Sequence, residues 1–107
     1  MKNIQININH NYQLNQFQNS LNLKVSTNGN INNEMIDYGI IIINKAYNLM
    51  NKGDDRAKYI SDSFDSKYPK KGKTWNCLIM NFIAGSISSN YSIIYSTGKE
   101  EILIFAD

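Results

Sequence analysis

The spacing of apolar residues changes from a helical period to alternation just after the only proline, Pro69. Before that point the apolar residues recur every three or four positions, at Ala57, Ile60, Phe64 and Tyr68. Such spacing is typical of one helical face. Pro69 is predicted to end the helix because the residue before a proline avoids helical dihedral angles.

Beyond residue 73 the apolar residues alternate with polar ones, which is the period of a β-strand. Four strands are predicted there, over Trp75–Met80, Ile83–Ser88, Tyr91–Ser96 and Glu101–Phe105. The connections between them are short, so we expect antiparallel neighbours.

The residues before this region supply one more strand and a first helix. Leu21–Ser26 alternates and is followed by turn residues, so it is predicted as a strand. Asn32 or Asn33 can cap a helix that begins next. Its predicted apolar stripe consists of Met35, Gly39, Ile42, Ile43, Ala46 and Met50.

Gly53 is predicted to stop this first helix, because glycine is favoured just past a helix end. The second helix is then expected to open at Asp54 and Asp55. The predicted fold class is therefore α+β, with an N-terminal strand, two helices and a four-stranded antiparallel region.

Asparagine or glutamine occupies eleven of the first 22 residues. Such a composition buries too little apolar surface to offset the entropy of ordering, so residues 1–22 are predicted to be a disordered tail and residues 23–107 a single domain. A prion-like assembly element is the alternative interpretation. Ile4, Ile6 and Ile8 alternate with polar residues, which leaves a short edge strand open.

Charge and composition argue against several classes of partner. The formal net charge of +2 is too small to indicate nucleic acid or an anionic membrane. The sequence has no apolar run long enough to cross a bilayer and no apolar block typical of a signal peptide. A single cysteine suits a reducing compartment. We therefore expect a cytoplasmic protein with neither nucleic acid nor a membrane as partner.

The sequence offers no convergent set of reactive groups. The one histidine, His10, lies in the predicted tail, and Cys77 lies mid-strand as a small apolar residue would. Asp54, Asp55 and Asp62 lack the spacing of a calcium loop, and no cysteine–histidine cluster indicates zinc. We expect no catalytic residue, no metal and no cofactor. A binding module is favoured over an enzyme.

Three segments, in order, resemble the dynein light chain family of the small light-chain-eight type. Asp55–Tyr68 is similar to the family's second helix, and Thr74–Ile79 (Thr-Trp-Asn-Cys-Leu-Ile) is close to its Thr-Trp-His-Cys-Ile-Val strand. Gly98 followed by Ile102–Phe105 matches the closing hairpin, and Asn33–Met35 matches the start of the first helix. The resemblance spans about Leu23 to Phe105 and indicates a divergent member.

The resemblance implies a homodimer in which each sheet receives a strand from its partner, here Ile83–Ser88. Short linear peptides would add to the edge of that swapped strand. The expected function is that of a non-enzymatic light chain of the dynein motor complex, or a dimeric hub. Its expected partners are the dynein intermediate chain or other proteins with short linear motifs, in the cytoplasm on microtubules or in cilia and axonemes. The alternative is a fixed structural subunit of an axonemal or other cytoskeletal assembly with one partner.

The resemblance also implies site residues. Those for peptide binding are Asp54, Asp55, Ile83, Gly85, Ser86, Ile87, Ser88, Ser92, Ile94 and Ser96. Those for the dimer interface are Asn76, Ile83, Ile87 and Ser89.

Several of these positions depart from the family. The family usually has aromatic or bulky residues where this chain has Ser86, Ser92 and Ser96, which predicts a shallower groove. Its usual lysine at the start of the second helix aligns with Asp54, and its interface histidine aligns with Asn76. We therefore expect weak binding of the family's typical glutamine-containing motif.

Overall fold

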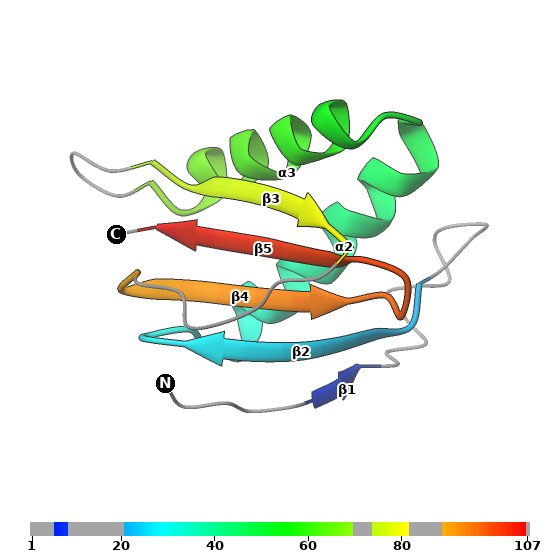
Figure 1. The fold of residues 1–107 in the computed structure, drawn as a ribbon. Helices are drawn as coiled ribbons and strands as arrows, with labels where there is room; N and C mark the ends of the chain where they lie inside the picture. Colours follow the sequence, from blue (N-terminus) through cyan, green and yellow to red (C-terminus); the bar gives the residue numbers. More distant parts are fainter. Residues whose placement is uncertain (1–5, 9–20, 70–73, 82–88, 107) are drawn as a thin grey trace.

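Two helices lie on one face of an antiparallel sheet in the computed structural model of this chain (Figure 1). The structure describes residues 6–8, 21–69, 74–81 and 89–106. The helices and strands are β1 (Ile6–Ile8), β2 (Leu23–Asn28), α2 (Asn33–Leu49), α3 (Gly53–Lys67), β3 (Asn76–Met80), β4 (Tyr91–Ser96) and β5 (Glu101–Ala106). The predicted α+β class, with two helices and an antiparallel sheet, is confirmed.

The strand order in the sheet is β1-β2-β4-β5-β3. β4 and β5 form a hairpin around Thr97–Glu100, as their short connection predicts. β3 pairs with β5 and β2 pairs with β4, so these two pairings join strands that are not consecutive in the chain. The predicted strand Ile83–Ser88 lies outside the described residues. β1 falls within the predicted tail of residues 1–22.

The first helix begins where the sequence indicates. Asn32 is the N-cap, and its side chain accepts a hydrogen bond from the Met35 amide at 2.9 Å. The prediction that Gly53 stops this helix is wrong. Met50, with φ of −130°, is the extended C-cap of α2, and Gly53 is the first residue of α3. Met50 ends the helix without a left-handed residue, so no glycine is required there.

The core lies between the helices and the inward face of the sheet, called here the covered face. Its strand residues are Leu23, Val25, Ile93, Tyr95, Ile102, Ile104 and Ala106, all at most 1% exposed. Ile36, Ile40 and Ile43 of α2 pack on them, together with Ile60 and Phe64 of α3.

Two aromatic residues fix the helices to this core. The Tyr95 hydroxyl donates to the Ile36 carbonyl oxygen at 2.8 Å, and a Cβ at Gly39 would lie 1.9 Å from that hydroxyl. Only glycine leaves room for the ring against α2. The Trp75 indole donates to the Tyr68 carbonyl oxygen at 2.7 Å and contacts the Phe64 ring. The C-terminal end of α3 is thereby fixed over β3.

Candidate functional site

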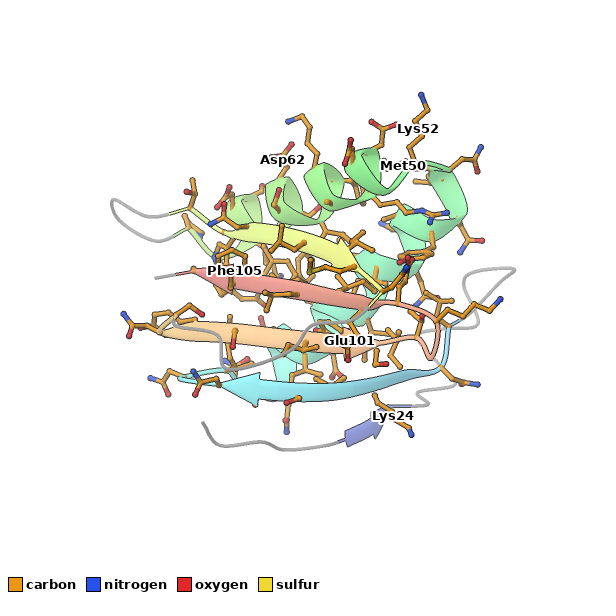
Figure 2. The ribbon with its side chains drawn as sticks, viewed as in Figure 1. Lys24, Met50, Lys52, Asp62, Glu101 and Phe105 are labelled. Carbon is orange, nitrogen blue, oxygen red and sulfur yellow. The ribbon has the colours of Figure 1, made fainter. Side chains whose placement is uncertain are left out.

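The outward face of the same sheet, called here the free face, has no helix or strand over it among the described residues (Figure 1). Cross-strand register defines three rows across β2, β4, β5 and β3 on this face. The rows are Asn28–Ser92–Phe105–Asn76, Ser26–Ile94–Leu103–Leu78 and Lys24–Ser96–Glu101–Met80. In Figure 2, Lys24, Glu101 and Phe105 lie along the sheet, whereas Met50, Lys52 and Asp62 lie toward the helices.

Apolar side chains gather on the free face toward β3. Leu78 and Met80 are 46% and 45% exposed, although leucine and methionine usually avoid such exposure on a strand. Register places Leu78 beside Leu103 and Leu103 beside Ile94, so an apolar row crosses three strands. Phe105 lies in the next row. Leu103 itself is only 3% exposed, so the exposed apolar part of this surface lies at Leu78 and Met80 on β3.

β3 is also the outermost strand on its side of the described sheet. An edge strand offers backbone N–H and C=O groups to another chain. The residues of β3 alternate between exposed and half-buried, whereas β5 beside it is mostly buried. An exposed apolar strand at an edge is a surface that another strand can extend.

A hollow of about 190 Å³ lies at the other end of the free face. Its lining residues are Lys24, Val25, Ser26, Ile94, Ser96 and Glu101. Ser26 and Ser96 have small side chains, which leaves a depression above this part of the sheet. Lys24 and Glu101 supply one positive and one negative charge. The hollow therefore suits a polar or zwitterionic segment better than a large apolar side chain.

The structure separates the predicted peptide-binding residues into two groups. Asp54 and Asp55 are exposed in the first turn of α3, on the helical side. Ser92, Ile94 and Ser96 lie on β4, on the free face, where Ser92 is only 1% exposed. The sheet lies between the two groups. The other predicted members, Ile83, Gly85, Ser86, Ile87 and Ser88, lie outside the described residues.

Two of the four predicted interface residues are described. Asn76 begins β3 on the free face and is exposed; its side-chain amide donates to the Thr74 carbonyl oxygen at 3.3 Å. The half-buried Ser89 precedes β4, and its hydroxyl donates to the Tyr91 carbonyl oxygen at 3.3 Å. Ile83 and Ile87 lie outside the described residues.

Sequence reasoning missed the apolar residues of the free face, namely Leu78, Met80, Leu103 and Phe105. A signal for them was present. Cys77–Met80 and Ile102–Phe105 are runs of consecutive apolar residues rather than alternating ones. Such runs are typical of strands that are buried on both faces. The covered face accounts for only one side of each strand.

Two titratable side chains among the described residues, Cys77 and Tyr47, have packing roles. Burial raises the pKa of the Cys77 thiol to about 12, so the thiol stays protonated and unreactive at neutral pH. Burial and the hydrogen bond that its hydroxyl donates to the Glu100 carboxylate raise the pKa of Tyr47. The Arg56 guanidinium lies 4.1 Å from the Tyr47 ring centre. These contacts join α2 and α3 to the β4–β5 turn.

Within the described ranges, no three acidic, histidine or cysteine side chains gather as a metal site would require. Neither α2 nor α3 has the length and apolar character to cross a bilayer. No protein-family model matches this chain, and no curated protein matches it in sequence. Among the described residues, the free face and the β3 edge are therefore the surfaces that bear on function.

Proposed function

We propose that this chain is a non-enzymatic, homodimeric protein-binding subunit of the dynein light chain type. Its free face and β3 edge form the dimer interface, with a strand exchanged between the protomers. Short linear segments of partner proteins add as strands beside that interface. The observation that carries the proposal is the pair of exposed apolar side chains, Leu78 and Met80, on the outermost strand β3. They lie on a face without a helix among the described residues, and the apolar row continues from Leu78 to the buried Leu103 and to Ile94.

The separation of the predicted peptide-binding residues limits which of them one groove can contain. Asp54 and Asp55 lie on the opposite side of the sheet from Ser92, Ile94 and Ser96 in one chain. When two chains pack through their free faces, the helices stay on the outside of the two sheets. A groove at that interface would therefore contain the β4 residues and not Asp54 or Asp55.

The dimer is tested by a charge placed in the centre of the proposed interface. Leu78→Asp would bury a carboxylate without a partner, at a cost of at least about 2 kcal/mol, or about 30-fold in the dissociation constant. Sedimentation equilibrium of the full chain measures this constant. We expect a dimer for the unaltered chain and a shift to monomer for the variant.

Leu49→Asp is the matched control, because Leu49 is 69% exposed at the end of α2, away from the free face. It should leave the dimer unchanged. A monomeric unaltered chain, or equal dissociation constants for the unaltered chain and Leu78→Asp, would remove the proposed interface.

The dynein intermediate chain and other proteins with short linear motifs are the proposed partners, at cytoplasmic microtubules or in cilia and axonemes. The small serine side chains around the hollow favour a specialised ligand over a broad set. A fixed structural subunit of a cytoskeletal assembly is therefore the second candidate. Affinity capture with the full chain separates the two functions: a hub returns several partners, whereas a fixed subunit returns one.

A further inference from the structure

The edge of the sheet opposite β3 is covered by the chain's own N-terminal segment. β1 pairs antiparallel with β2, with Ile6 opposite Val25, Asn7 opposite Lys24 and Ile8 opposite Leu23. Without β1, β2 would be an edge strand, and its outward backbone groups would be open to another strand. This pairing is distant from the free-face row around Leu78.

The register matches the residue types of β1 to the two faces of the sheet. Val25 and Leu23 are 1% and 0% exposed on the covered face, and the residues opposite them are isoleucines. Lys24 is exposed on the free face, and the residue opposite it is Asn7. An apolar–polar–apolar segment therefore satisfies this edge, and other extended segments of that pattern would satisfy it equally.

β2 is held in place without help from β1. Its residues pair with β4 over five positions, from Lys24–Ser96 to Asn28–Ser92. Just before β2, the Leu21 amide donates to the side-chain oxygen of Asn44 at 2.9 Å. Asn44 is 0% exposed, and its own amide donates to the Ile40 carbonyl oxygen. These contacts anchor the chain to α2, so loss of β1 would leave the β2 edge intact.

The pairing of β1 with the β2 edge is expected to be weak. It has three residues, and so short a pairing adds few backbone hydrogen bonds. Residues 9–20 lie between it and the anchored Leu21, so the segment is tethered at an effective concentration on the order of millimolar. An identical segment on another molecule competes once the local protein concentration approaches that value.

We propose that the outer edge of β2 is a second strand-addition site, which Ile6–Ile8 occupies reversibly in cis. The competing occupant is the same segment of a second copy of this chain. Exchange of these segments links copies through the edge opposite β3. It is independent of the dimer proposed above, since it uses neither β3 nor the apolar row.

The test uses the full chain and a fluorescent peptide of residues 1–12, with binding followed by anisotropy. The variant Ile6→Pro/Ile8→Pro frees the edge, because proline removes backbone donors from β1. If the site is occupied in cis about nine-tenths of the time, the unaltered chain binds the peptide about tenfold more weakly than this variant. The matched variant Ile6→Val/Ile8→Val keeps the strand pattern and should behave like the unaltered chain.

Amide hydrogen exchange locates the site. Backbone amides of β2 that face β1 should exchange faster in the proline variant and slow again when the peptide is added, with β5 unchanged. Emission of the single, buried Trp75 reports that the proline variant remains folded. Equal peptide affinity for the unaltered chain and the proline variant, or no peptide binding to the folded proline variant, overturns the proposal. The proposal is also overturned if a peptide with proline in place of Ile6 and Ile8 binds as tightly as the unaltered peptide.

Discussion

The covered face and the free face of this sheet are made by the same strands, yet their side chains differ in how deeply they are buried. On the covered face, Tyr95, Ile102 and Ile104 are 0% exposed beneath two helices. On the free face, Leu78 and Met80 are almost half exposed. Leu103 and Ser92, nearer the middle of the free face, are only 3% and 1% exposed, so its exposed apolar part lies toward β3. The covered face therefore determines the fold of one chain, whereas the β3 side of the free face is the surface that we propose another chain completes. Substitutions on the two faces should change different measurements.

The largest effect is expected from removing a side chain at the centre of the covered face. Ile102 lies between Tyr95 and Ile79 in register. Ile102→Ala should lower the free energy of unfolding by about 2–5 kcal/mol, since it removes buried carbons and leaves a cavity. Leu78→Ala, one strand away on the free face, should lower it by less than about 1 kcal/mol in the monomer. Urea unfolding measures both changes.

The Leu78→Ala variant should instead weaken the dimer, as sedimentation reports. If Leu78→Ala costs the monomer as much as Ile102→Ala does, the two faces do not differ and the comparison fails.

A smaller loss of stability is expected where α2 meets the covered face. Gly39→Ala would bring a methyl group against the Tyr95 hydroxyl, and overpacking of this kind costs about 1–3 kcal/mol. This cost outweighs the gain in helix propensity of about 1 kcal/mol. Gly53→Ala is the matched control in α3, since no atom lies within 4 Å of its added Cβ. Thermal unfolding should show a lower melting temperature for Gly39→Ala alone; equal values would show that Tyr95 moves aside without cost.

Local patterns were sufficient to predict most helices and strands. The Tyr91–Ser96 strand and the end of α3 before Pro69 follow from period, turn residues and the proline. Asn32 was one of two predicted caps, and its hydrogen bond decides between them. Gly53 was misassigned because a glycine after a helical stripe resembles a stop signal. No local sequence pattern predicts the extended backbone that Met50 adopts.

The candidate site was harder to predict because it depends on register. The pairing of β3 with β5 brings Leu78 beside Leu103, and no short connection in the chain indicates that pairing. Gly39 was predicted as part of an apolar stripe, but its close approach to Tyr95 comes from the other half of the chain. Residues assigned by resemblance, such as Asp54 and Ser96, are found on opposite sides of the sheet. A local alignment carries no information about which face each residue occupies.

The smallest effect is expected at alkaline pH, from Cys77 at the margin of the covered face. Burial raises the pKa of its thiol from 9.0 to about 12. Above pH 9 the unfolded chain loses this proton and the folded chain keeps it, so stability present below pH 9 is lost as pH rises toward 12. By pH 10 this amounts to about 1.4 kcal/mol. The variant Cys77→Ala lacks this loss. Urea unfolding at pH 8 and pH 10, followed by Trp75 fluorescence, should therefore show a steeper decline for the unaltered chain than for Cys77→Ala. If the free energy of unfolding declines equally in both proteins, the Cys77 thiol is in contact with solvent and burial does not raise its pKa.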